Sequence, residues 1–250
     1  MQVLETRNKS AQDIMSLDAK LLDQLKAQDK PILHFYDWQG PSLTYGYFIT
    51  LDKYLDLKKL KDKGIEAARR PTGGGIIFHL WDLAFSFLMP AGHKDFFENP
   101  LENYRFVHQI VLKALKSLEI NIQKILYSLK EKCQEKLVLV PAKAELKLIE
   151  KAQSPLAFCM ARPSKYDLVF YNKKAAGAAQ RKKKSGYLHQ GSIALVMPDE
   201  KLLFELLKDP KLAQAIIEES FFFSDDMQNL EKMRAELRKL LLYQFEKTLR

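Results

Sequence analysis

The segment from residue 69 to residue 79, Arg-Arg-Pro-Thr-Gly-Gly-Gly-Ile-Ile-Phe-His, constrains the fold and chemistry of this chain more than any other part. Its glycine triplet consists of Gly73, Gly74 and Gly75. Glycines adopt backbone conformations closed to other residues, so consecutive N–H groups can point at one oxyanion, and Arg69 and Arg70 add fixed positive charge. The pattern predicts an anion-holding loop that leads into a strand. A glycine triplet alone also suits a hairpin turn or a flexible joint.

The length and composition of the chain indicate a folded protein with a proper core. It has 250 residues, of which 47% are hydrophobic. The sequence has no run of about 18 apolar residues for a membrane span. Its first residues lack the apolar core of a secretory signal, so we expect a cytoplasmic protein without a membrane partner. Cys133 and Cys159 have no partner at metal-ligand spacing, which predicts neither a disulfide scaffold nor a metal site.

The net charge of +9 favours an acidic partner, a nucleotide or a nucleic acid. Lysines and acidic residues alternate through most of the expected helices, and the one concentrated basic run is 181–184. That run suits either an exposed hairpin turn or a binding patch. A nucleic-acid-binding module is therefore a rival interpretation, but the chain shows no docking helix, zinc module or aromatic RNA-binding strand, so we expect no nucleic-acid partner.

Apolar periodicity and turn residues predict an α+β fold, in which a mixed, mostly antiparallel β-sheet is flanked by helices. We expect helices at 10–26, 51–63, 99–118, 200–207, 211–218 and 225–249, and strands at 32–36, 42–48, 65–69, 76–78, 83–89, 166–171, 175–180 and 190–196. Strands 76–78 and 83–89 are expected to be neighbours, and 122–155 is expected to be an irregular insert. Residues 1–250 are expected to form a single domain.

A strand of small residues forms the second chemically distinctive segment. Lys174 leads into Ala-Ala-Gly-Ala-Ala at 175–179, where a core strand would ordinarily carry Val, Ile or Phe. The small side chains allow either an apolar ligand or a tightly packed neighbour to lie close to the backbone. Lys174 is a compact positive charge suited to a carboxylate or phosphate oxygen.

Several motifs in the same order resemble the biotin/lipoate protein ligase superfamily, on its lipoate and octanoate side. These motifs are Leu17-Asp18, 41–48, 69–79, 173–180 and 188–193. The resemblance implies the catalytic-domain fold of that superfamily, without a recognisable C-terminal accessory domain, and an enzyme that attaches a lipoyl or octanoyl group to a protein lysine. Biotin-protein ligase is the rival within the superfamily, and the Lys-Ala-Ala-Gly and Leu-His-Gln-Gly-Ser segments match the lipoate type better.

The resemblance also implies roles for individual residues. Lys174 would be the catalytic lysine, and the strands around Gly177 and Gly191 would line a tunnel for the acyl chain. The implied acyl- or adenylate-binding residues are Arg70, Thr72, Gly73, Gly74, Gly75, His79, Gly177, Ala178, His189, Gly191 and Ser192. A histidine at a strand end is more often a hydrogen-bonded, ligand-orienting residue than a proton carrier, and we expect this role for His79 and His189.

Two mechanisms remain open within this resemblance. The segment 159–167 is similar to the one that carries the nucleophilic cysteine of one class of octanoyltransferases, which makes Cys159 a candidate acyl-thioester nucleophile; the alternative is a buried free cysteine. Those enzymes usually carry arginine where this chain has Gly75, whereas ATP-dependent ligases carry the full glycine triplet. The segment 79–83 departs from the usual ligase pattern. We therefore expect a lipoate-protein ligase acting through an acyl-AMP intermediate, with an octanoyltransferase as the alternative.

The resemblance implies substrates and partners for both mechanisms. A ligase would use ATP, with Mg²⁺, and lipoate, whereas a transferase would use an octanoyl-carrier protein. The acceptors would be lipoyl carrier domains of 2-oxoacid dehydrogenase E2 subunits or the glycine cleavage H protein. A compact ligase can require an accessory subunit for the activation step. We also expect the basic run 181–184 to help dock an acidic carrier domain.

Overall fold

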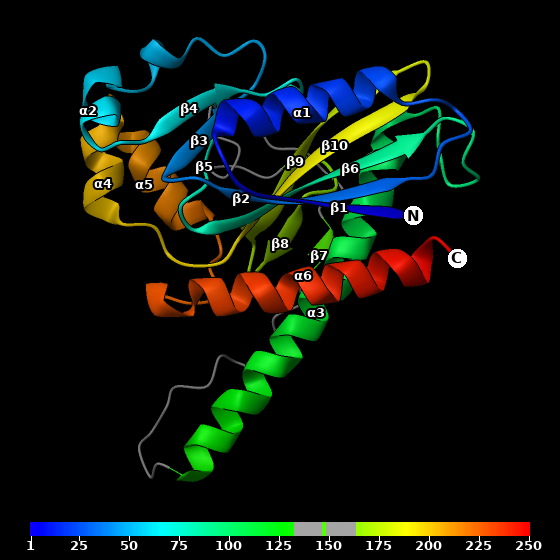
Figure 1. Cartoon of the computed structure of the whole chain (residues 1–250). Helices are drawn as coiled ribbons and strands as arrows, with labels where there is room; N and C mark the ends of the chain where they lie inside the picture. Colours follow the sequence, from blue (N-terminus) through cyan, green and yellow to red (C-terminus); the bar gives the residue numbers. More distant parts are fainter. Residues whose placement is uncertain (133–146, 149–163) are drawn as a thin grey trace.

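The computed structural model describes residues 1–132, 147–148 and 164–250, and two β-sheets organise this part of the chain (Figure 1). The larger sheet has the strand order β1 (Gln2–Lys9), β2 (Ile32–Trp38), β6 (Asp82–Pro90), β10 (Gly186–Ala194), β9 (Lys173–Lys183), β8 (Leu168–Phe170) and β7 (Lys147–Leu148). The smaller sheet has the order β4 (Glu66–Arg69), β3 (Ser42–Tyr45) and β5 (Ile76–Phe78). Only the pairs β1–β2 and β3–β4 are parallel among the described strands, which confirms the expected mixed, mostly antiparallel α+β architecture.

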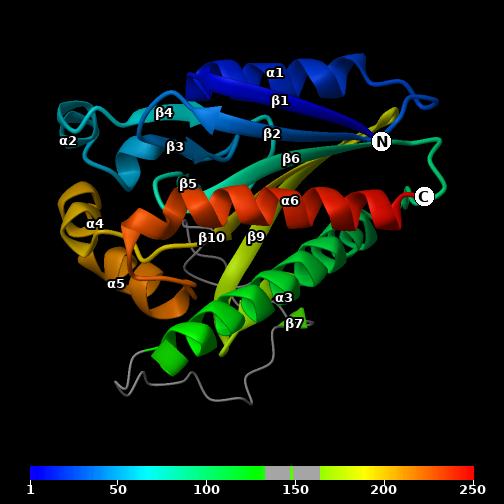
Figure 2. The ribbon, with the colours of Figure 1, turned by 60° about the horizontal axis from the view of Figure 1, so that its bottom comes forward.

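Helices cover both faces of the larger sheet (Figures 1 and 2). They are α1 (Ala11–Gln24), α2 (Leu57–Asp62), α3 (Pro100–Lys132), α4 (Glu200–Leu206), α5 (Pro210–Glu219) and α6 (Leu230–Thr248), with short 3₁₀ helices at η1 (Leu51–Lys53) and η2 (Met227–Asn229). Helix α1 lies on one face, whereas α3 and α6 lie on the other. Ser10 caps α1 as the sequence predicts, because its hydroxyl accepts a hydrogen bond from the backbone N–H of Asp13 at 3.0 Å. Among the described residues, no helix combines the length and apolar character needed to span a membrane.

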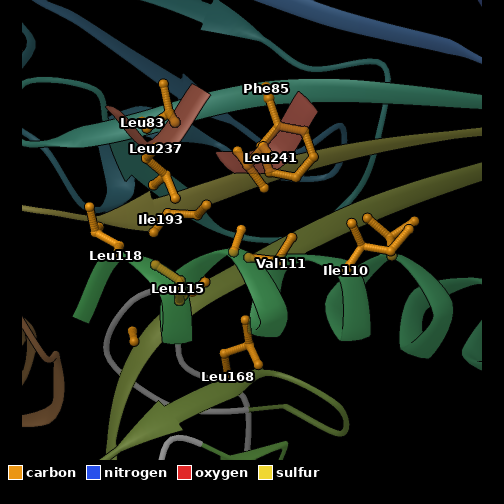
Figure 3. Close-up of a cluster of buried hydrophobic side chains, with 14 of the residues drawn as sticks. Leu83, Phe85, Ile110, Val111, Leu115, Leu118, Leu168, Ile193, Leu237 and Leu241 are labelled. Carbon is orange, nitrogen blue, oxygen red and sulfur yellow. The ribbon is translucent and has the colours of Figure 1, made fainter. Parts of the chain in front are cut away.

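The main hydrophobic core fills the space between the larger sheet and helices α3 and α6 (Figure 3). Phe85 and Ile193 point from the sheet toward Val111 of α3 and Leu241 of α6, and all four are almost fully buried. Removing each such side chain from water contributes about 1.5–3 kcal/mol. On the opposite face of the same sheet, Leu188 packs in a separate cluster under α1. The central strands are therefore buried on both faces.

The smaller sheet packs on α4 and α5 and carries the glycine loop between β4 and β5. Leu43 and Ile76 from this sheet share a hydrophobic cluster with Leu203 of α4 and Ile216 of α5. Strands β5 and β6 belong to different sheets, so the expectation that they pair as neighbours is wrong. Periodicity reports which residues are buried, and it does not report which strands pair.

Three further boundaries differ from the prediction. Strand β1 was not expected, because its residues are mostly exposed on an edge strand and show no strong alternation. Helix α3 continues to Lys132, so the first part of the expected irregular insert 122–155 is helical; that stretch contains neither Gly nor Pro. The helix expected at 51–63 is divided into η1 and α2, since Asp56 starts a new helix by accepting hydrogen bonds from the N–H groups of Lys58 and Lys59.

Candidate functional site

Lys174 lies at the start of β9 in a buried ion pair. Its ammonium nitrogen is 2.6 Å from Oδ2 of Asp167, and the residue is only 3% exposed. The hairpin that leads into β9 has a two-residue turn, Tyr171-Asn172, in which both residues have positive φ (52° and 62°), as type I′ turns require. The turn brings Lys174 back alongside β8, which begins at Leu168, directly after Asp167.

A β-bulge determines the face on which the lysine lies. Leu168 pairs with Ala176 and Val169 pairs with Lys174, so Ala175 is an extra residue in β9. Without the bulge, Lys174 and Gly177 would point to opposite faces, because side chains alternate along a strand. With it, the lysine side chain lies over Gly177: a Cβ added there would be 2.5 Å from Cε and 2.7 Å from Nζ of Lys174. The glycine in the small-residue strand therefore makes room for the lysine itself.

Asp167 is held in place by more than the lysine. The N–H and hydroxyl of Ser164 donate to Oδ2 at 2.7 and 2.8 Å, and the Tyr104 hydroxyl donates to Oδ1. Burial would raise the pKa of the Asp167 carboxyl, but the charge of Lys174, together with His108 and the hydrogen bonds from Lys174 and Tyr104, holds that pKa below its ordinary value. Asp167 therefore remains an anion, and the pair fixes the position of the Lys174 cation.

The glycine loop is braced from within by Arg70, which is buried. Its guanidinium donates to Oγ1 of Thr44 at 2.8 Å and to the carbonyl oxygens of Gly73 and Gly75 at 3.0 and 2.7 Å. Gly74 has a φ of 83°, in the left-handed region that favours glycine. Arg70 thus holds the shape of the loop.

The loop is also attached to the end of β3. The N–H of Gly46 donates to the Gly75 carbonyl at 3.1 Å, and the N–H of Tyr47 donates to the Thr72 carbonyl at 3.0 Å. A Cβ on Gly46 would come within 1.9 Å of the Gly74 carbonyl oxygen, so only glycine permits this approach. The two loops therefore form one unit.

Two buried carboxylates connect this unit to the larger sheet. On one side, Thr72 donates to Oε1 of Gln190 at 2.7 Å, and Nε2 of Gln190 donates to Asp18 at 2.6 Å. Asp18 also accepts a hydrogen bond from Ser86 and lies 2.8 Å from Nδ1 of His34. Because all these polar groups are buried and paired, the network resists distortion at its loop end.

The second carboxylate is Asp82. Nδ1 of His79 lies 2.8 Å from Asp82, and Nε2 of the same ring lies 2.7 Å from the Thr44 hydroxyl that also accepts from Arg70. Ser192 donates to Asp82 at 2.6 Å. His79 is therefore a hydrogen-bonded link between the sheet and the loop, as expected for a residue that orients its neighbours.

Strand β10 brings the two halves of the site onto one face of the sheet. Gln190 and Ser192 are two residues apart and so point to the same side. Gln190 contacts Thr72 of the glycine loop, and Ser192 pairs with Gly177, over which Lys174 lies. The glycine loop and Lys174 therefore lie on the same face of the larger sheet, next to neighbouring positions of β10.

An apolar pocket adjoins the lysine on this face. It is lined by Ile76, Ile77, Phe78, Trp81, Ala194, Pro198, Ile216 and Phe222, with Asp82, Ser192 and Ser220 as its polar residues. Ser220 forms a β-bridge with Lys174, and the N–H of Phe221 donates to the Lys174 carbonyl at 2.8 Å. The pocket therefore has an apolar wall and a charged neighbour at one end, which suits a ligand with an apolar chain and a polar head.

The opposite face holds His189 and Gly191, which the sequence placed in the site. Nδ1 of His189 bonds the Gln180 amide at 2.9 Å, and a Cβ on Gly191 would be 2.5 Å from the Phe85 ring. The space beside Gly191 is thus filled by a core side chain. Ala178, whose N–H donates to the Tyr104 hydroxyl at 2.8 Å, lies on this side too.

Burial keeps the two histidines on this face neutral. It lowers the pKa of His108 to about 4 and that of His189 well below its ordinary value. Nδ1 of His108 lies 2.7 Å from the Tyr166 carbonyl and donates to it. The rings of the two histidines are 5.4 Å apart, and they support the strand behind Lys174 without carrying charge.

Two sequence predictions lie elsewhere. Cys159, the candidate nucleophile, is outside the described residues. The basic run 181–184 lies at the β9–β10 hairpin, where Lys182 pairs with Glu98 at 2.5 Å and Lys183 pairs with Asp23. Part of its charge is therefore neutralised within the chain.

The chain thus combines a mixed, mostly antiparallel sheet with a glycine loop braced by Arg70 and a buried lysine on β9. The chain matches the family model of the lipoyl protein ligase A/B catalytic domain over residues 10–249, and it belongs to that family. This membership confirms the resemblance drawn from the motifs.

Known proteins of two kinds are similar to the chain. The octanoyltransferase LipM of Geobacillus kaustophilus (strain HTA426) is 35% identical over 198 residues, which cover 78% of this chain and 65% of that protein, less than two thirds of its length. A crystal structure of lipoate-protein ligase A bound with ATP is 25% identical, with a TM-score of 0.68, covering 99% of this chain and 85% of that chain. Protein Ta0514 of T. acidophilum, solved with bound lipoic acid, has a TM-score of 0.69 at 24% identity over 99% of this chain and 85% of that chain, and shows the shared fold.

Proposed function

We propose that this chain transfers an octanoyl group from an octanoyl-carrier protein to a lysine of a lipoyl carrier domain. The observation that carries the proposal is the buried ion pair of Lys174 and Asp167 beside an apolar pocket, in a chain 35% identical to an octanoyltransferase LipM. The sequence alone favoured a lipoate-protein ligase and kept the transferase as the alternative. The relatives favour that alternative.

In this mechanism the reaction has two steps, with Cys159 as the nucleophile suggested by its sequence context. The Cys159 thiolate attacks the thioester carbonyl, a new carbon–sulfur bond forms, and the thiol of the carrier leaves as a thiolate that takes up a proton. The acceptor lysine amine then attacks the acyl-cysteine. An amide forms, the amine loses a proton, and Cys159 is released.

The residues of the site supply the remaining requirements. Each tetrahedral intermediate carries an oxyanion, which a fixed Lys174 ammonium stabilises more in the transition state than in the substrate. Asp167 acts through Lys174 by holding that ammonium in position. The apolar pocket accepts the acyl chain, and the loop held by Arg70 and Thr72 forms the rim beside the reacting carbonyl. His79, Ser192, Gly177, Gly73 and Gly74 preserve the shape of this rim.

A lipoate-protein ligase is the second candidate, and Gly75 is the observation that favours it. The complete glycine triplet resembles that of ATP-dependent ligases, and the chain is 25% identical to a lipoate-protein ligase A solved with ATP. In that mechanism lipoate and ATP, with Mg²⁺, form an acyl-AMP, and amides of the glycine loop hold its phosphate.

Both candidates share the acceptor. We propose a lipoyl domain of a 2-oxoacid dehydrogenase E2 subunit or the glycine cleavage H protein in this role. An accessory subunit for activation belongs to the ligase mechanism alone, because only that mechanism needs to build an adenylate.

The deciding experiment supplies each set of substrates separately. The protein is incubated with a lipoyl domain and octanoyl-carrier protein without ATP, and in parallel with the domain, lipoate and ATP. We expect ATP-independent octanoylation and an octanoyl adduct on Cys159, detected by mass spectrometry, with activity lost in Cys159→Ser and Lys174→Ala. Cys133→Ser is the matched control and retains activity. ATP-dependent lipoylation that persists in Cys159→Ser would instead establish the ligase and refute the transferase.

A further inference from the structure

The loop that follows β3 presents aromatic side chains to solvent. Phe48 is 89% exposed, more than any other large hydrophobic side chain among the described residues, and its neighbour Tyr47 is 53% exposed. Their rings contact each other edge to face, with centroids 5.2 Å apart. Aromatic side chains are enriched in protein interfaces, and Tyr and Arg are among the residues that most often dominate the binding energy.

This aromatic pair is attached directly to the glycine loop. Besides the hydrogen bonds of Gly46 and Tyr47 to that loop, the N–H of Ile49 donates to the Gly46 carbonyl at 3.0 Å and closes a tight turn. The guanidinium of Arg69, the residue before the brace Arg70, lies over the Tyr47 ring at 5.9 Å from its centroid. The pair is therefore held on the rim of the proposed active site.

The charge around the loop is positive. Residues 47–69 contain six lysines and arginines against four acidic residues. Two of those four acids are occupied as helix caps: Asp56 accepts from the first turn of α2, and Glu66 accepts from the N–H groups of Ala11 and Gln12. Lys59 and Lys63 are paired with Asp56 and Glu205, so the positive charge that lies next to the aromatic pair is the Arg69 guanidinium. This charge beside exposed rings is complementary to an acidic partner with an apolar patch.

We propose that Tyr47, Phe48 and Arg69 form the docking surface for the acidic acceptor domain whose lysine receives the acyl group. This inference rests on the proposed acyl transfer and holds for either mechanism, because both use the same acceptor. A lysine reaches into the site only by its four-carbon stem, so its domain must touch the rim. A donor thioester carried on a long prosthetic arm can reach the site while its carrier stays away from the rim. The surface at the rim therefore fits the acceptor domain better than the donor.

The test compares Phe48→Ser with Tyr243→Ser, a matched control whose ring is 56% exposed on α6. For each full-length variant, the KM for the lipoyl domain is measured, together with acyl release to hydroxylamine, which needs no acceptor domain. Direct binding of the lipoyl domain, without acyl donor, is measured by calorimetry. We expect Phe48→Ser to raise both the KM and the dissociation constant about tenfold or more, with hydroxylamine turnover unchanged. Arg69→Glu should likewise raise the KM and the dissociation constant for the lipoyl domain, and Tyr243→Ser should change neither.

Each other outcome is informative. Equal KM and dissociation constants in Phe48→Ser and Tyr243→Ser would overturn the docking surface. A loss of acyl-enzyme formation from octanoyl-carrier protein in Phe48→Ser would assign the surface to the donor and overturn it as well. If the unmodified protein fails to activate any acyl group, the proposed function fails, whereas the calorimetric comparison still decides the docking surface.

Discussion

The substitution Gly177→Ala tests whether the position of Lys174 governs catalysis. The new methyl group would lie 2.5 Å from Cε of Lys174, whereas carbon atoms in favourable contact are about 3.5 Å apart. The flexible end of the lysine must therefore move by about 1 Å, because the neighbouring backbone of β9 is fixed by pairing on both sides. Oδ1 of Asp167, at 3.2 Å from the same position, leaves little room for the lysine to move while keeping its ion pair.

A displacement of this size at a reacting centre costs about 10²-fold in rate. We expect the kcat of acyl transfer to fall by about this factor, with a loss of stability of about 1–3 kcal/mol, typical of adding a methyl group to a packed interior. The rate is measured with a lipoyl domain and octanoyl-carrier protein, and the folded state is monitored by urea denaturation. Gly40→Ala is the control, since a Cβ at Gly40 meets no atom within 4 Å. A Gly177→Ala variant that folds and retains nearly the full rate would refute the argument that Lys174 must occupy this position.

Two further predictions concern stability and the loop. Burial lowers the pKa of His108 to about 4, so between pH 6.5 and 4 the unfolded chain binds a proton that the folded chain does not. The free energy of unfolding is therefore unaffected by His108 above pH 6.5 and falls by about 3 kcal/mol as the pH is lowered to 4. Urea denaturation from pH 7.5 to 4.5 should show a shallower loss for His108→Gln, and parallel profiles would contradict the assignment. Thr72→Val removes the hydrogen bond to Gln190, so it should lower kcat and reduce the stability of the folded protein by about 1–3 kcal/mol. The control is Thr50→Val, which should change neither kcat nor stability, because Thr50 is exposed and its side chain makes no capping hydrogen bond. Equal kcat values for the two threonine variants would exclude a positioning role for Thr72.

Local features of the fold were predictable, because the physical causes lie within a few residues of each other. The Ser10 cap, strand β5 and helices α4 and α5 follow from capping residues and apolar spacing that a short window contains. The separation of β5 from β6 into two sheets was not predictable in this way. It depends on which distant strands each one meets, and β5 pairs with β3 about thirty residues earlier in the chain.

The same division applies to the candidate site. Motif order identified Lys174 and the glycine loop, but it assigned no role to Asp167, although that residue lies within a recognised segment. The need for Asp167 arises from the burial of Lys174. The position of that lysine depends on a β-bulge, and Asp167 is oriented by a hydrogen bond from Tyr104 on another element. Likewise, Gly191 was interpreted as lining a tunnel, whereas its missing side chain accommodates Phe85 from a neighbouring strand. A glycine in a sequence indicates that space is needed without identifying what occupies it.

Arg70 bears directly on the choice between an adenylate and a thioester. A phosphate in a glycine loop needs free N–H groups and a cation that can bond its oxygens. The two terminal nitrogens of the Arg70 guanidinium instead donate to the carbonyl oxygens of Gly73 and Gly75 and to Thr44, so these donors serve the loop. The proposed thioester mechanism requires less of the loop, because in it the oxyanion is stabilised by the ammonium of Lys174, which Asp167 holds in place.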